Sequence, residues 1–134
     1  MARGEKLGAF ALSEADAGSD AASLKARAVR DGDGWVLNGE KMWVTNGGEA
    51  DVVLVMARTD EPDDRRGPRG IGAFVVPTDT PGYEVGKKED KTGLRSSETV
   101  SISFNDMRVG SEALLLRAAY AFEQATLARR PPEL

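Results

Sequence analysis

The stretch GAFALSEADAGSD, residues 8–20, decides the fold that we expect, because a strand ends there in a loop of small residues. Phe10 and Leu12 point to one face of that strand, and the residues beside them point to the other. In the loop, Gly18 and its small neighbours leave main-chain N–H groups accessible to a flat or anionic ligand. Taken alone, such a stretch is more often a plain strand that ends in an ordinary Asp/Gly/Ser turn.

Short apolar segments recur at regular spacing along the rest of the chain, separated by turn residues. Turn signals at residues 31–34 and at Asn38-Gly39 predict hairpins, so that three consecutive strands form a meander. The unbroken apolar run at residues 52–57 is typical of a strand buried on both faces. The expected strands are residues 7–13, 25–30, 35–37, 41–46, 51–58, 70–76, 83–88 and 99–105.

The end of the chain has a different composition. Residues 111–130 are rich in Ala, Leu, Glu and Arg and lack Gly and Pro, which predicts a helix with Ser111 as its N-cap. The sequence as a whole predicts an all-β fold, an antiparallel, Greek-key-like barrel or sandwich of seven to eight strands with a C-terminal helix. We divide the chain into a β-domain, residues 1–109, and a helix and tail, residues 110–134.

Composition argues against several classes of function. A chain of 134 residues suffices for one domain with a core, and a net charge of −4 without a long basic run argues against nucleic-acid binding. The absence of cysteine and histidine removes disulfides, thiolate chemistry and the commonest metal ligand, so we expect no metal site. No apolar run reaches the ~18 residues of a membrane span, and no apolar signal region follows the first charges, so we expect a cytoplasmic protein.

A second stretch, KMWVTNGG at residues 41–48, pairs Trp43 with the hydroxyl of Thr45 on one face of a strand. A planar heteroaromatic cofactor needs such packing together with a few fixed polar contacts. Taken alone, Trp43 is more often a core residue, and Ser13 and Thr45 are more often ordinary strand hydroxyls.

Together, GAFALSEADAGSD and NGEKMWVTNGG resemble the middle β-domain of the acyl-CoA dehydrogenases. A third stretch, GIGAFVVPTDTPGYEVGKKEDKTGLRSSETVSISFNDMRV at residues 70–109, resembles the same domain in the same order, so that the resemblance covers residues 5–109. It implies a flavoprotein oxidoreductase of fatty acid metabolism. In this family FAD lies against the β-domain, an acyl-CoA thioester is dehydrogenated at its α and β carbons, and electrons leave through an electron-transfer flavoprotein.

The resemblance places eight residues of this chain at the cofactor. Ser13 is expected near the pyrimidine edge of the flavin, and Ser19 is expected, with Gly18, where flavin and acyl-CoA meet and to help hold the substrate. Trp43 is expected to pack on the flavin, and Thr45 to lie near its redox nitrogen N5. The full set of expected cofactor-binding residues is Phe10, Leu12, Ser13, Gly18, Ser19, Trp43, Val44 and Thr45.

The family's catalytic base is a glutamate of a C-terminal helical domain, and neither Glu14 nor Glu40 matches its motif. We therefore expect no catalytic residue in this chain, inactivity of the chain alone, and weak FAD binding or none. Ala15-Asp16 stands where the family often has Pro-Gly, which loosens the turn and brings a negative charge toward a site for phosphates. Gly110 stands where a proline is common.

Two other functions are compatible with the sequence. The same domain occurs in acyl-CoA oxidase-like flavin enzymes, which would pass electrons to O₂ instead of to a flavoprotein. A non-enzymatic binding or assembly module is the alternative of another class, in which the apolar stripe of the helix mediates self-association.

Overall fold

The computed structural model describes residues 1–59 and 67–117, which form eight strands and three short 3-10 helices. The strands are β1 Gly8–Ala11, β2 Arg27–Asp31, β3 Gly34–Thr45, β4 Val52–Arg58, β5 Ile71–Pro77, β6 Tyr83–Lys88, β7 Thr99–Val109 and β8 Leu114–Arg117. The 3-10 helices are η1 Ala21–Ser23, η2 Gly67–Gly70 and η3 Ser111–Ala113. The all-β fold with up to eight strands is therefore confirmed.

All eight strands belong to one sheet in the order β6-β7-β3-β2-β4-β5-β8, with β1 beside β4. Most neighbours are antiparallel, as expected, but β1 runs parallel to β4, and β2 meets β4 in parallel at Arg27 and Arg58. The sheet is thus mixed, and it is open, because β6 and β8 end it. The parallel pairs join segments distant in sequence, which local turn signals do not reveal.

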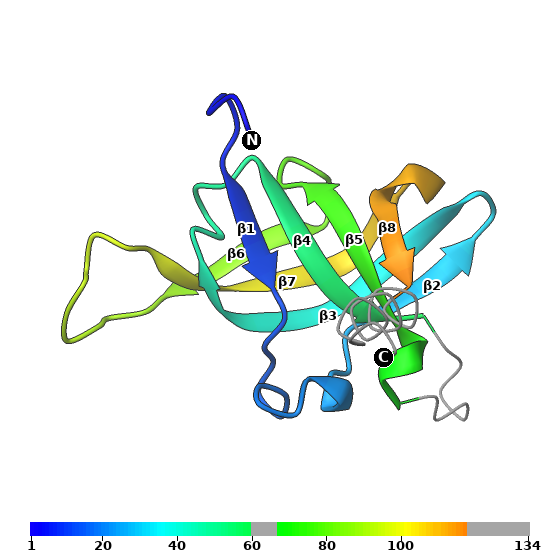
Figure 1. Cartoon of the computed structure of the whole chain (residues 1–134), viewed down its shortest axis with the longest axis horizontal. Coiled ribbons are helices and arrows are strands. Elements are labelled where there is room, and N and C mark those ends of the chain that lie inside the picture. Colours follow the sequence, from blue (N-terminus) through cyan, green and yellow to red (C-terminus); the bar gives the residue numbers. More distant parts are fainter. Residues whose placement is uncertain (60–66, 118–134) are drawn as a thin grey trace, which may run out of the picture.

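The sheet curls around one apolar core. Figure 1 shows β1, β4, β5 and β8 crossing in front of β3 and β7, so that side chains from both halves meet. Trp35 of β3 contacts Phe74 of β5 edge to face, with ring centroids 5.4 Å apart. Burial alternates along β4, where Val53, Val55 and Ala57 are buried and their neighbours only partly so. The prediction that β4 is fully buried on both faces is therefore wrong.

The hairpin predicted at Asn38-Gly39 is also wrong, because β3 continues through it as one strand of 12 residues. Here β7 bulges, so that Asn105 and Asp106 lie opposite Asn38 alone. The Asn38 amide donates to a carboxylate oxygen of Asp106 at 3.0 Å and accepts from its N–H at 2.9 Å. Gly39 has a φ of +136°. Asn38 and Gly39, residue types that usually form a turn, thus lie opposite a bulge of β7 instead.

The C-terminal helix does not begin where the sequence predicts it. Residues 111–113 form η3, and residues 114–117 form β8, which pairs with β5 through Leu114 and Phe74. Ser111 is therefore not the N-cap of an α-helix. The remainder of the expected helix, residues 118–130, and the self-association assigned to it lie outside the described residues.

Gly39 has a positive φ and no room for a side chain, since a Cβ would lie 2.7 Å from Cα of Ala26. Gly32 in the β2–β3 turn has a φ of +57° and an open Cβ position. We expect Gly32→Ala to lower the free energy of unfolding by about 1 kcal/mol, and Gly39→Ala by about 3 kcal/mol or more. Urea unfolding followed by circular dichroism measures both, and equal losses would contradict the close approach of Ala26 to Gly39.

Candidate functional site

The loop after β1 and the second half of β3 lie side by side. The Met42 N–H donates to the Ser13 carbonyl at 2.8 Å. One residue earlier, the Lys41 ammonium donates to the Leu12 carbonyl at 2.9 Å. The structure thus joins the two stretches that carry all eight expected site residues, although they are 21 or more residues apart along the chain.

The expected site residues fall into three groups by exposure. Phe10, Gly18, Ser19, Trp43 and Thr45 are exposed, and Trp43 keeps 59 % of its surface accessible. Leu12 and Ser13 are half-buried, and Leu12 packs against a small cluster of Ala17, Leu24 and Ile71. The side chain of Val44 is buried in the main core, so only its main-chain atoms are left to meet a ligand. The structure thus gives Trp43 a surface position and not the core position that is commoner for tryptophan.

Trp43 lies on a bulge of β3. The pairing of β3 with β7 passes from Lys41–Ile102 to Val44–Val100, so that Met42 and Trp43 together lie opposite Ser101. Trp43 has a φ of +59°, in the left-handed region that bulky side chains avoid. Such a backbone costs about 1–3 kcal/mol. Bulges re-aim side chains, and this one presents the indole outward while Val44 points into the core.

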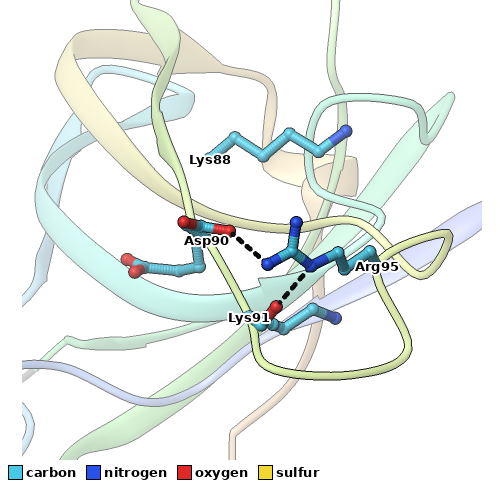
Figure 2. A pocket seen from close by; sticks show the side chains of 5 residues that line it. Lys88, Asp90, Lys91 and Arg95 are labelled. Carbon is cyan, nitrogen blue, oxygen red and sulfur yellow. Dashed lines mark hydrogen bonds and ion pairs between the residues drawn. The ribbon is translucent and has the colours of Figure 1, made fainter.

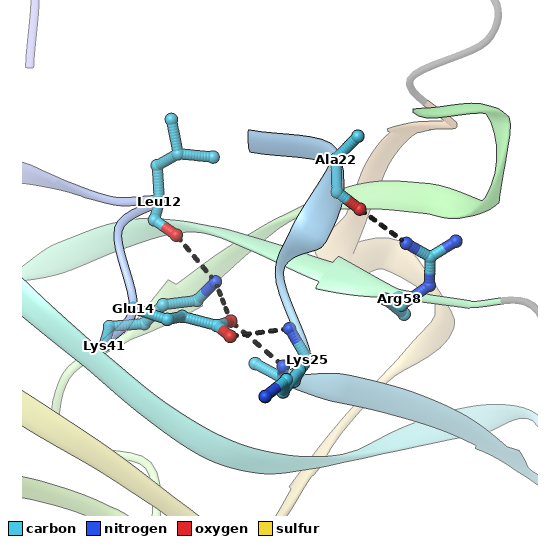
Figure 3. A network of polar contacts seen from close by, with 7 residues as sticks. Leu12, Glu14, Ala22, Lys25, Lys41 and Arg58 are labelled. Atoms are coloured by element: carbon cyan, nitrogen blue, oxygen red, sulfur yellow. Dashed lines mark hydrogen bonds and ion pairs between the residues drawn. The ribbon is translucent and has the colours of Figure 1, made fainter. Parts of the chain in front are cut away.

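A buried ion pair lies directly beneath this bulge. Lys41 is completely buried, and its Nζ lies 2.7 Å from a carboxylate oxygen of Glu14 (Figure 3). Burial lowers the pKa of Lys41, and the hydrogen bond and charge of Glu14 oppose that shift. Removing one partner of a buried pair costs about 3–5 kcal/mol, because the other charge is left uncompensated. Sequence reasoning missed this pair, although Lys41 continues the inward alternation of Trp35 and Leu37.

Glu14 has further partners at the start of β2. Its carboxylate accepts the main-chain N–H groups of Lys25 and Ala26, the latter at 3.0 Å (Figure 3). In the same view the Arg58 guanidinium donates to the Ala22 carbonyl at 3.0 Å, which fastens η1 to β4. The loop after β1 is therefore tied to β2 and β3, and not only to its own strand.

Ala15 and Asp16, which stand where the family often has Pro-Gly, lie in a closed turn. Glu14 and Ala17 exchange two main-chain hydrogen bonds, at 2.7 and 3.2 Å. The Asp16 carboxylate pairs with the exposed Lys25 ammonium at 2.6 Å, and this hydrogen bond and the charge of Lys25 lower the pKa of Asp16. The negative charge expected near phosphates is therefore compensated locally. Glu14, Asp16, Lys25, Glu40 and Met42 are among the residues that line a hollow of about 190 Å³ beside this turn.

The turn after β3 is held by Tyr83 of β6 and by Glu98, which directly precedes β7. The Tyr83 hydroxyl donates to the Gly47 carbonyl at 2.6 Å, and Glu98 accepts the N–H of Asn46 through its carbonyl and that of Gly48 through its carboxylate. Burial, and then the charge of Glu98, raise the pKa of Tyr83 to about 12. These contacts fix the end of β3, where Thr45 lies.

A second hollow, of about 300 Å³, lies in the β6–β7 loop and is shown in Figure 2. It is lined by Lys88, Glu89, Asp90, Lys91 and Arg95. The Arg95 Nε donates to the Lys91 carbonyl at 2.8 Å, and its guanidinium lies 3.4 Å from the Asp90 carboxylate. Arg95, which stands in a family-like motif, thus has partners within its own loop.

Residues 1–59 and 67–117 contain no group of three or more acidic, His or Cys side chains that could hold a metal ion. No helix in these residues is long and apolar enough to cross a membrane. The exposed indole of Trp43 and the exposed residues Gly18, Ser19 and Thr45 are of the kinds that a flat cofactor with polar edges, such as a flavin, would need.

The positive φ of Trp43 predicts that glycine destabilises this position less than alanine does, which is the reverse of the usual order in a strand. Glycine adopts a positive φ freely, so Trp43→Gly should unfold with a free energy about 0.5–1 kcal/mol higher than Trp43→Ala. The matched control is Thr45, an exposed residue of the same strand without a positive φ, where the glycine variant should be the less stable one. Urea unfolding of the four variants checks this, and a Trp43→Gly variant less stable than Trp43→Ala contradicts it.

The raised pKa of Tyr83 predicts a loss of stability in alkali. The folded state favours the neutral phenol, so its contribution is present below the ordinary pKa of 10 and is lost as the pH rises toward 12. In a Tyr120→Phe background, phenol absorbance should titrate near pH 12 instead of pH 10, and Tyr83→Phe should reduce the fall in unfolding free energy between these values. A titration midpoint near pH 10 would show that the hydroxyl is not buried against Gly47.

Comparison with known proteins shows the family to which the chain belongs. The family model for the middle domain of acyl-CoA dehydrogenase matches residues 9–107. The short-chain specific mitochondrial acyl-CoA dehydrogenase of Rattus norvegicus is 48 % identical over 122 residues, which are 91 % of this chain and 29 % of the rat protein. The chain thus spans less than a third of the length of that relative.

Solved structures have the same fold. A chain from a structure of the electron transferring flavoprotein of Acidaminococcus fermentans is 42 % identical with a TM-score of 0.84, over 92 % of this chain and 32 % of the other. A glutaryl-CoA dehydrogenase of Mycobacterium smegmatis in complex with FADH2 is 44 % identical with a TM-score of 0.77, over 87 % of this chain and 28 % of the other. The chain belongs to the acyl-CoA dehydrogenase family and contains its middle domain.

Proposed function

We propose that this domain forms one wall of a site for FAD and an acyl-CoA thioester, in an enzyme that dehydrogenates the thioester at its α and β carbons. One observation carries the proposal: the exposed Trp43 ring lies on a strained bulge that is hydrogen-bonded to the loop of Ser13. An exposed, strained tryptophan contributes little to folding, and such strain concentrates where a ligand is bound.

In this proposal each residue has a role set by its exposure. Trp43 packs on the flavin ring, and the hydroxyls of Thr45 and Ser13 meet its polar edges. Phe10 and Leu12 supply apolar contacts, and Val44 contributes through its main chain alone. Gly18 and Ser19 lie where cofactor and thioester meet. FAD, when bound, supplies the acceptor for the hydride that leaves the β carbon.

In this proposal a group outside this domain takes the proton of the α carbon, as the resemblance to the family implies. Both oxygens of the Glu14 carboxylate are engaged, with Lys41 and with the N–H groups of Lys25 and Ala26, so Glu14 serves the fold. We therefore propose that the chain alone does not turn over acyl-CoA, and that in the whole enzyme an electron-transfer flavoprotein removes the electrons. Cytoplasmic location stays a prediction.

The visible and fluorescence spectra of the purified chain, recorded during titration with FAD, test this function. We expect saturable quenching of Trp43 emission, and a dissociation constant raised about tenfold, or about 1.4 kcal/mol, by Trp43→Ala. Thr45→Ala should have a smaller effect, since it removes one hydrogen bond of about 0.5–1.5 kcal/mol. For Trp43→Ala, flavin absorbance replaces emission as the signal.

Leu94→Ala is the matched control, because Leu94 is a large apolar residue, 84 % exposed, in the β6–β7 loop. It should leave FAD affinity within twofold. Equal affinities of Trp43→Ala and the unaltered chain would refute the flavin site, and absence of saturable binding would mean that this chain alone holds too little of the site to retain FAD. Turnover of an acyl-CoA by the chain with an artificial acceptor would refute only the statement that it is inactive alone.

A further inference from the structure

Lys41 is the only charged residue that is buried in the described part of the chain. Its ammonium has two partners in the loop after β1: the Glu14 carboxylate at 2.7 Å and the Leu12 carbonyl at 2.9 Å (Figure 3). Replacing a buried ion pair by apolar side chains of similar volume often leaves a protein as stable as before, or more so. Stability alone therefore does not account for a charge at this position.

The location of the pair suggests what it does. The residue after Lys41 donates its N–H to the Ser13 carbonyl at 2.8 Å, and the next residue is Trp43 with its φ of +59°. On the loop side, Glu14 directly follows Ser13 and opens the closed turn that leads to Gly18 and Ser19. Three hydrogen bonds thus join loop and strand at the point where each turns toward its exposed residues.

Glu14 extends this connection to β2. Its carboxylate accepts the N–H groups of Lys25 and Ala26, which lie where η1 passes into β2. At the start of the loop of Ser13–Ser19, Lys41 binds the Leu12 carbonyl and the Glu14 carboxylate. Beyond the end of the loop, the Glu14 carboxylate accepts the N–H groups of Lys25 and Ala26. A neutral or shorter side chain at position 14 would release one of these anchors.

We propose that Lys41 and Glu14 are positioning residues that hold the loop of Ser13–Ser19 and the Trp43 bulge in one fixed relative arrangement. Neither side chain touches the cofactor; both act through Ser13 and Trp43. The result is a flavin-binding face that is formed before the cofactor arrives, which reduces the ordering that binding would otherwise require. The role of this face in flavin binding rests on the proposed function, whereas the positioning of Trp43 by the ion pair does not depend on it.

The experiment isolates Trp43 as a spectroscopic reporter. The chain has two tryptophans, and the Trp35→Phe variant retains Trp43 as its single tryptophan. The Trp35 indole N–H has no hydrogen-bond partner among the described residues, so this replacement removes no hydrogen bond there. In this background we compare Lys41→Met and Glu14→Gln. The readouts are acrylamide quenching and near-ultraviolet circular dichroism of Trp43, followed by FAD titration, with folding checked by far-ultraviolet circular dichroism.

We expect Lys41→Met to remain folded, to change the quenching constant of Trp43 at least twofold, and to raise the dissociation constant of FAD at least tenfold. Glu14→Gln should act in the same direction with a smaller effect, because its amide oxygen still accepts an N–H. The matched control is Lys6→Met, which removes an exposed ion pair with Asp51 at 2.9 Å and should leave every readout within 1.5-fold.

If Lys41→Met fails to fold, the double variant Lys41→Met with Glu14→Gln replaces it, since it buries no charge and keeps an acceptor for β2. A folded variant with unchanged Trp43 spectra and FAD affinity within twofold overturns the proposal, because the pair would then only fill space. If the unaltered chain takes up no FAD, this chain holds too little of the proposed site to retain the cofactor, and the Trp43 spectra still decide whether Lys41 and Glu14 position the bulge.

Discussion

A buried ammonium keeps its charge only while its partners stay in place, and this requirement couples three segments of the domain. Lys41 on β3 needs Glu14, and Glu14 also accepts the first N–H groups of the chain that leads into β2. If one of these groups moves away, its partner is left buried without a hydrogen bond. Each unsatisfied buried polar group costs about 1–3 kcal/mol. The loop after β1 is thereby tied to β3 and to the start of β2, although it has little regular structure of its own.

The pair acts on a strand that has two irregularities. The ladder between β3 and β7 is the longest in the sheet, and it is interrupted at Asp106 and at Trp43, both with positive φ. Bulges increase local twist and bend the strands that carry them. One strand can therefore bury Trp35 in the core at its start and present Trp43 to solvent near its end. The curl that closes the core and the exposure of the candidate site have the same cause.

Periodicity located the strands up to residue 109, although it divided β3 into two, because alternation reflects burial on a curled sheet. Local sequence signals failed where partners distant in the sequence decide the structure, as at β8. Asn38-Gly39 has the residues of a tight turn, and whether such residues make a turn or a bulge depends on Asp106, which is 68 residues away. The helix expected from residue 111 was wrong over its first residues because the free edge of β5 offers pairing to Leu114–Arg117. Edge pairing outweighs the helix propensity of Ala and Leu, which is small per residue.

For the site, the sequence located the two stretches that meet but not the interaction that joins them. Lysine is usually solvated, so its residue type does not predict burial of Lys41. Its inward register follows from Trp35 and Leu37 only because β3 continues through Asn38-Gly39 as one strand. Trp43 is the opposite case, an apolar residue that is exposed. An indole that is 59 % exposed gains little from burial, and its positive φ adds a cost, so folding alone would favour a smaller residue there. The exposure and the strain of Trp43 therefore support the proposal that a flat ligand covers this side chain.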